Sequence, residues 1–170
     1  LGSSLITLGG DDNQKQKFLP QIVEGNLTTA LALEENSRHS PFTINTFAKK
    51  DGNSFKISGN KTFVIDGYSS DLLIVAARTE GSDTDVSGIT LFLVDSDIDG
   101  IEITKTSMVD SRNSANVQFN ETVVPASNIL GEENSGASIL EEVLDRAQIA
   151  ISAEMLGNAS QAFEITLDYL

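Results

Sequence analysis

The segment 51–71 carries the pattern that most restricts what this chain can fold into. It opens with the residues DGN, a turn signal, because Gly and Asn tolerate the positive φ that tight hairpins need. Apolar and polar residues then alternate over 55–58, as they do in a half-buried strand. Gly59-Asn60 interrupts the alternation with a turn or bulge, and 62–65 resume with residues of high β-propensity. The segment therefore predicts two successive hairpins, a β-meander.

Further strand-sized segments lie on both sides of this meander. Short apolar or alternating stretches bounded by turn residues occupy 28–33, 43–49, 72–77, 89–94, 101–105 and 109–124. No pattern with a helical period separates them. The predicted fold class is therefore mainly β with flanking helices, built around an antiparallel β-barrel or sandwich over about residues 27–129.

Helical patterns are confined to the two ends of the chain. Over 11–24, acidic residues at the start and lysines further on suit a helix dipole, and Pro20 predicts a break. Over 136–156, apolar residues recur at the spacing of an amphipathic helix, and Gly157 with Asn158 predicts an interruption after it. Most helical stability comes from packing an apolar face, so we expect further helices beside this one.

Composition excludes several classes of function. The chain has 11 basic and 25 acidic residues, a formal net charge of −14, so we expect neither nucleic acid nor an anionic membrane as a partner. A phosphate-rich ligand would have to rely on backbone amides and a few local cations. The absence of cysteine excludes disulfides, thiolate metal sites and cysteine nucleophiles.

Targeting signals are also missing from the sequence. No apolar run reaches the roughly 18 residues of a membrane span. The first residues lack both Met and the basic region of a signal peptide, so we expect a cytoplasmic protein and a segment cut from a longer chain.

The residues DSDIDG at 95–100 match the first half of an EF-hand calcium loop. The twelfth position, which should be a bidentate Glu, is Thr106, and both flanks have the pattern of strands. We interpret the motif as an Asp-rich β-turn without a metal, which disfavours a free-standing calcium-binding β-module. His39 is the only histidine, so no histidine metal cluster and no Ser-His-Asp triad are predicted.

The order of motifs along the chain resembles the central β-domain of the acyl-CoA dehydrogenases. DG at 51–52, FKI at 55–57, G-x-K at 59–61 and ART at 77–79 follow that family's pattern. VPA at 124–126 and LGEE at 130–133 continue it, and FLP at 18–20 resembles the end of the family's N-terminal helical domain. The resemblance implies three parts: the end of the N-terminal helical domain at 1–26, the central β-barrel domain at 27–132, and the start of the C-terminal helical domain at 133–170.

The resemblance also implies a chemistry. Members of this family remove two hydrogens from the Cα–Cβ bond of an acyl-CoA thioester, with a glutamate base taking a proton and FAD accepting a hydride. This chain would supply one wall of the flavin and thioester site, and would be inactive alone because the family's base is expected beyond residue 170. The implied partners are an acyl-CoA substrate, an electron-acceptor flavoprotein and other subunits, in a homo- or hetero-oligomer formed through the C-terminal domain. The implied cofactor-binding residues are Leu31, Leu33, Glu34, Ser40, Phe63, Val64 and Ile65. The implied substrate-binding residues are Ser40, Asp145 and Gln148.

The sequence departs from the family at its flavin signature, a Thr-Glu-Pro followed by Gly-Ser-Asp. Of these, only Glu35 and Ser40 remain. Glu34 replaces a Thr that faces the flavin pyrimidine edge, Ile65 replaces a Thr that offers its hydroxyl to flavin N5, and Phe63 replaces a stacking Trp. Two functions follow: a divergent acyl-CoA dehydrogenase that still binds FAD, or a non-catalytic or partner-dependent subunit with a degraded flavin site.

Overall fold

The computed structural model describes residues 1–170 and centres on β4 (Leu72–Arg78), in which every residue is buried. This strand pairs in parallel with β1 (Thr29–Ala32) and antiparallel with β5 (Ile89–Asp95). Its side chains alternate between two apolar clusters, so that Ile74 points into one and Val75 into the other. Apolar packing on both faces explains why its sequence is a continuous apolar run.

The other strands extend the sheet on either side of β4. They are β2 (Phe47–Asp51), β3 (Ser54–Ile65), β6 (Ile101–Thr106), β7 (Ser114–Pro125) and β8 (Ile129–Leu130). The order is β6-β7-β3-β2-β4-β5-β8, with β1 attached to β4. The sheet curls so that the rings of Phe55 on β3 and Phe92 on β5 lie 5.2 Å apart, although these strands do not pair. A short 3₁₀ turn (Ala126–Asn128) precedes β8.

The predicted fold class is confirmed, with two corrections of detail. The sheet does not close into a barrel, since β6 and β8 remain as separate edges, and the pairs β1–β4 and β2–β4 are parallel. The first predicted hairpin, β2–β3, is present, but β3 does not pair with β4, so the predicted meander is wrong. Strand β3 instead continues through Gly59 as a bulge and pairs with β7. As predicted, no α-helix lies within the β region.

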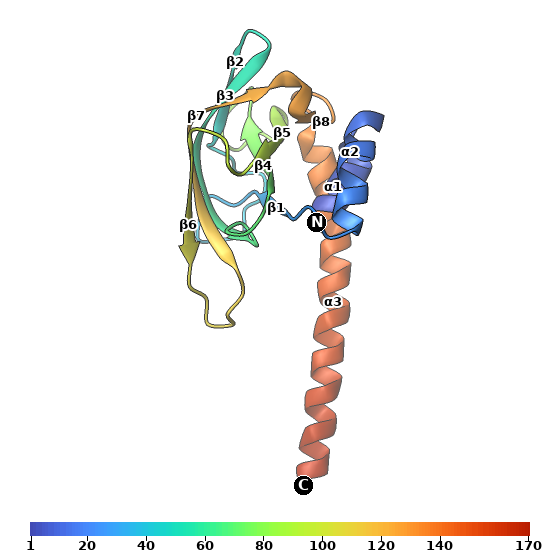
Figure 1. Ribbon diagram of the computed structural model, residues 1–170. Helices are drawn as coiled ribbons and strands as arrows, with labels where there is room; N and C mark the ends of the chain where they lie inside the picture. The colour runs from blue at the N-terminus through green and yellow to red at the C-terminus, as the bar shows by residue number, and fades with distance from the viewer.

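Two short helices lie on one face of the sheet, α1 (Gly2–Gly9) and α2 (Asp12–Val23) (Figure 1). Asp11 and Gln14 form a capping box that starts α2. The predicted break at Pro20 is wrong, because α2 runs three residues past it. Pro20 has no N–H to donate to the carbonyl of Gln16, one helical turn earlier. Because both residues are exposed, water can hydrate that carbonyl instead. Helix α1 had no sequence signal that we recognised.

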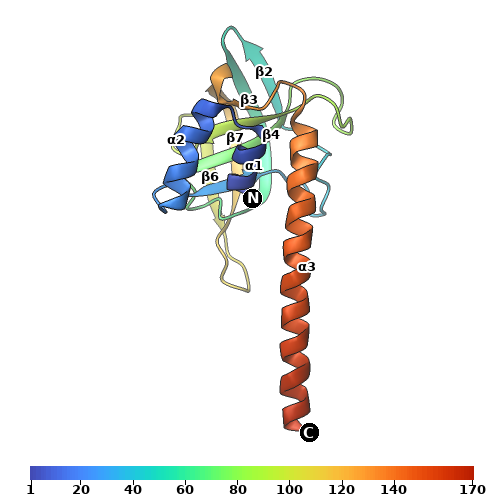
Figure 2. The ribbon, with the colours of Figure 1, turned by 90° about the vertical axis from the view of Figure 1, so that its right-hand side faces the viewer.

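The third helix, α3 (Gly136–Tyr169), is continuous, so the interruption predicted at Gly157 is wrong. A glycine in an exposed helix costs only about 1 kcal/mol relative to Ala, and the flanking turns carry the helix through. Leu140 and Val143 pack into the cluster between sheet and helices, whereas every residue from Gln148 onward is exposed. Figures 1 and 2 show this second half of α3 extending well beyond the sheet. None of the helices combines the length and the apolar character needed to cross a membrane.

Candidate functional site

A cavity of about 660 Å³ lies between the sheet and α3. Its walls come from the first residue of the chain, the segment that leaves β1, the end of β3 and the middle of α3. Its volume falls within the range of small-molecule and cofactor sites. The lining residues are Leu1, Leu31, Leu33, Glu34, Glu35, Asn36, Ser37, Arg38, His39, Thr62, Phe63, Ile65, Leu144, Ala147, Gln148 and Ile151.

Six of the residues expected at the flavin and substrate site line this one cavity, although they come from three distant parts of the sequence. They are Leu31, Leu33, Glu34, Phe63, Ile65 and Gln148. Three expected residues are not in its lining. Ser40 donates its hydroxyl to Thr43 Oγ1 at 2.7 Å, Val64 is buried in the core of the sheet, and Asp145 is exposed on α3.

Several other lining residues could not be selected from the sequence. Leu144, Ala147 and Ile151 follow the helical spacing of α3 and were recognisable only as an apolar face. Arg38 and His39 bring the only basic side chains into the lining, apart from the buried Lys61 behind it. The Arg38 guanidinium is therefore a positive charge in the lining of the cavity, in a chain that is acidic as a whole.

The Glu34 carboxylate is held by its own loop. Its Oε1 lies 2.6 Å from His39 Nδ1, and its Oε2 accepts a hydrogen bond from the Ser40 N–H at 3.1 Å. Its backbone carbonyl accepts from the Thr62 N–H at 2.7 Å, which ties the loop to β3. Both oxygens of the Glu34 side chain therefore have hydrogen-bond partners at the rim of the cavity.

A buried ion pair supports the wall behind this loop. Lys61 Nζ lies 2.7 Å from Glu35 Oε1 and donates to the Leu33 carbonyl at 3.0 Å. The Lys61 side chain is fully buried and that of Glu35 is 6% exposed. The other donors to Glu35 are the N–H groups of Asn45 and Thr46, at 2.7 and 2.9 Å. The pair thus joins the end of β1, the start of β2 and the middle of β3.

Both partners of this pair have shifted pKa values. Burial lowers the pKa of the Lys61 ammonium from 10.5 to about 8, against the opposing effect of the Glu35 charge. Burial alone would raise the pKa of Glu35, but the charge and hydrogen bond of Lys61 and the two N–H groups together outweigh it and lower that pKa. At neutral pH the pair is therefore ionised.

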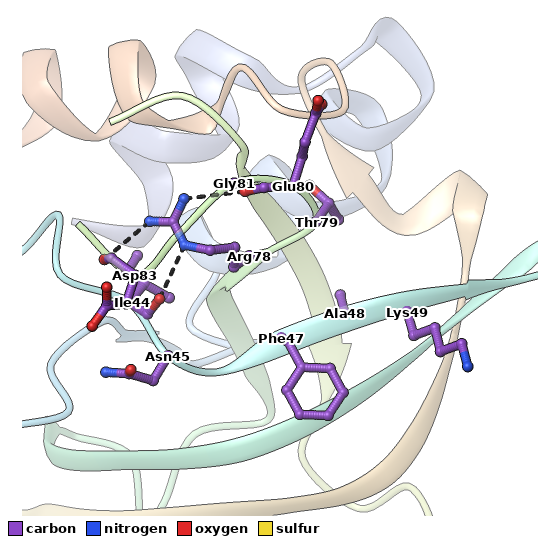
Figure 3. Close-up of a pocket in the computed structure, with 10 residues that line it drawn as sticks. All are labelled: Ile44, Asn45, Phe47, Ala48, Lys49, Arg78, Thr79, Glu80, Gly81 and Asp83. Carbon is purple, nitrogen blue, oxygen red and sulfur yellow. Dashed lines mark hydrogen bonds between the residues drawn. The ribbon is translucent and has the colours of Figure 1, made fainter. Parts of the chain in front are cut away.

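A second cavity of about 430 Å³ is lined by residues of β2, by Arg78 at the end of β4 and by the loop that follows it (Figure 3). All five guanidinium N–H donors of Arg78 are committed to backbone carbonyls. The acceptors are the carbonyls of Ile44, Glu80, Asp83, Asp85 and Ser87. No donor is left for a ligand, so Arg78 fixes the conformation of the 79–88 loop instead of binding an anion.

The aspartates at 95, 97 and 99 lie at the end of β5 and in the turn before β6, so the predicted β-turn is confirmed. No group of three or more His, Asp or Glu side chains gathers anywhere in the chain in an arrangement that could hold a metal ion.

Comparison with known proteins identifies the family of the chain. A family model described as "Acyl-CoA dehydrogenase, middle domain" matches residues 30–122, more than half of the chain. Mitochondrial isovaleryl-CoA dehydrogenase from Pongo abelii is 34% identical over 97% of this chain and 40% of its own length. The acyl-CoA dehydrogenase structure from Geobacillus kaustophilus superimposes with a TM-score of 0.76 at 37% identity, covering 81% of this chain and 38% of that one.

A third similar structure is the ChsE4-ChsE5 complex from Mycobacterium tuberculosis, with a TM-score of 0.77 at 25% identity over 85% of this chain and 38% of the matched one. The chain spans less than half the length of the curated relatives that it matches. The family model, the relatives and the solved structures all point to the same family. The chain therefore belongs to the acyl-CoA dehydrogenase family.

Proposed function

We propose that this chain forms one wall of the FAD and thioester site of an acyl-CoA dehydrogenase, which dehydrogenates the Cα–Cβ bond of an acyl-CoA. The observation that carries the proposal is the single apolar cavity in which Leu31, Leu33, Phe63, Ile65 and Gln148 meet. We also propose that the chain comprises the end of an N-terminal helical domain at 1–26, a central β-domain at 27–132 and the start of a C-terminal helical domain at 133–170. We further propose that the protein binds an acyl-CoA substrate, passes electrons to an acceptor flavoprotein and assembles with other subunits.

The residues present fit a flat aromatic cofactor. Phe63, which lines the cavity, is 53% exposed, and a stacked ring system would cover it. Leu31, Leu33 and Ile65 add aliphatic surface that excludes water. When bound, FAD would accept the hydride that the substrate releases. This chain would bind and orient it through Phe63, by stacking, and through backbone N–H groups in place of the hydroxyl that Ile65 lacks. Gln148, at the same cavity, would contact the substrate.

Titration of the full-length protein with FAD tests this proposal, and the visible circular dichroism of the bound flavin is then recorded. Phe63→Ala should weaken binding about two- to twelvefold, because stacking on an aromatic ring contributes about 0.5–1.5 kcal/mol beyond the buried area. Phe47→Ala is the matched control, since Phe47 is 52% exposed but lines the other cavity. FAD binding that is absent, or equally weakened by both replacements, would contradict the proposal.

A second candidate function is a non-catalytic or partner-dependent subunit of the same family. Two observations favour it: the carboxylate of Glu34 and the aliphatic Ile65 both line the cavity in which the flavin would sit. Reduced flavin gathers negative charge near N1, and a carboxylate there opposes reduction. The similar ChsE4-ChsE5 structure is a complex of two proteins, which supports this candidate.

The double replacement Glu34→Thr with Ile65→Thr separates the two candidates. If the chain belongs to a working dehydrogenase with a divergent site, it binds FAD as it stands, and the double variant raises the flavin reduction potential and retains FAD better. If the site is degraded, FAD binds only after the replacement. A potential and an affinity that both stay unchanged would mean that these side chains do not face the flavin.

A further inference from the structure

The backbone of Phe63 is held in an unusual conformation. Its φ is +56°, in the left-handed region that bulky side chains rarely adopt. The four other non-glycine residues with positive φ are Asp66, Ser111, Glu121 and Asn134, all of them polar. Outliers of this kind cost roughly 1–3 kcal/mol each and persist only where the surrounding structure enforces them.

The pairing of β3 with β7 shows what enforces it. Lys61 pairs with Val117 and Val64 pairs with Ala115, so two residues of β3, Thr62 and Phe63, lie opposite Asn116 alone. This is a β-bulge, in which the extra residue breaks the alternation of side chains. As a result, Thr62 and Phe63 both line the large cavity, and Val64 turns into the core.

Asn116 closes the gap that the bulge leaves in the ladder. Its side-chain Oδ1 accepts a hydrogen bond from the Phe63 N–H at 3.3 Å. Its backbone is fixed independently, because Asn116 pairs with Thr104 on the neighbouring strand β6. The side-chain oxygen therefore takes the place of the ladder carbonyl that Phe63 would meet in a regular pair.

We infer that Asn116 is a positioning residue for ligand binding: it holds the bulge closed and thereby keeps the Phe63 ring at the cavity, ready to stack on a planar aromatic ligand. The inference rests on the proposed function for the identity of that ligand, a flavin. Strand β7 would thus act on the site through Asn116, although it contributes no residue to the cavity lining. The ring is thus pre-organised before the ligand arrives, which lowers the entropic cost of binding.

The first measurement needs no ligand. Amide hydrogen exchange at Phe63 is compared in the full chain, in Asn116→Ala and in Gln118→Ala. Gln118 is the matched control, because it is exposed on the same side of β7 and bonds only to Asn120. Loss of one hydrogen bond should speed exchange at Phe63 about two- to twelvefold in Asn116→Ala, with no change in Gln118→Ala. Asn116→Asp keeps an acceptor oxygen and should restore slow exchange.

The second measurement uses FAD. Asn116→Ala should weaken FAD binding about two- to twelvefold and reduce the visible circular dichroism of the bound flavin, whereas Asn116→Asp and Gln118→Ala should leave both unchanged. A purely structural role for Asn116 would lower stability without altering the dichroism of flavin at saturation.

The outcomes for the inference and for the proposed function are distinct. If the unaltered chain binds no FAD, the proposed function fails, and hydrogen exchange alone decides whether Asn116 holds Phe63. If FAD binds but Asn116→Ala behaves like Gln118→Ala in both measurements, the inference is overturned and the proposed function stands.

Discussion

Replacing Lys61 with Met tests whether the buried ion pair holds the wall of the cavity together. The Met side chain fills similar volume but removes the ammonium group. That group lies 2.7 Å from Glu35 Oε1 and donates to the Leu33 carbonyl at 3.0 Å. Glu35 would remain nearly buried, with only the N–H groups of Asn45 and Thr46 as donors.

The expected loss of stability follows from that uncompensated charge. Removing one partner of a buried pair destabilises a protein by about 3–5 kcal/mol, because the other charge stays in a medium of low dielectric constant. Native domains are stable by only about 5–15 kcal/mol, so the variant should lose a large fraction of its stability. With a urea m-value of about 2 kcal/mol/M, the unfolding midpoint should fall by about 2 M.

Urea unfolding of the full chain, followed by far-ultraviolet circular dichroism, measures this loss. The double variant Lys61→Met with Glu35→Gln removes both charges and should recover most of the midpoint. Lys56→Met is the control, since Lys56 pairs with Asp51 at 3.1 Å on the surface. If Lys61→Met shifts the unfolding midpoint no more than this control does, the buried ion pair does not hold the wall of the cavity together.

Four shorter predictions concern other positions. Gly59→Ala should destabilise the chain by about 1–3 kcal/mol, because φ there is +145° and a Cβ would lie 2.6 Å from Thr46 Cα; urea unfolding measures this. The pKa of Glu35 is lower in the folded protein than its unfolded value of 4.5. The ionised carboxylate therefore stabilises the fold fully above pH 4.5, and this stability is lost as the pH falls through the folded-state pKa. The stability of Glu35→Gln should accordingly fall less steeply in acid. Arg78→Lys should speed hydrogen exchange throughout the 79–88 loop, since an ammonium group cannot reach five carbonyls. Calcium should give no saturable heat in calorimetry, whereas a site removed by Asp97→Ala would revive the EF-hand interpretation.

The local patterns of the sequence determined the class of fold. Alternation, β-branched runs and turn residues located the strands, and the DGN turn correctly predicted the β2–β3 hairpin. The absence of helical periodicity between 43 and 124 correctly confined the helices to the ends. The order of motifs identified the family, because that order depends on the sequence alone.

The pairing of strands was decided only by tertiary structure. Alternation shows which residues share a face, but it does not show which strand lies alongside, so the parallel pairs around β4 were missed. Helix ends were misjudged at Pro20 and Gly157 for a related reason: local breaking tendencies of a few kcal/mol or less are overridden where the rest of the helix is stable.

The candidate site divides in the same way. Leu31, Leu33 and Phe63 could be placed at the cavity from their position in the motifs, and the structure brings them together. The position of Val64 could not be predicted in this way. A one-residue bulge opposite Asn116 changes which side of the sheet each following residue of β3 faces. The partnership of Lys61 with Glu35 joins residues 26 positions apart, and only the packing of three strands creates the buried space in which those two charges must meet.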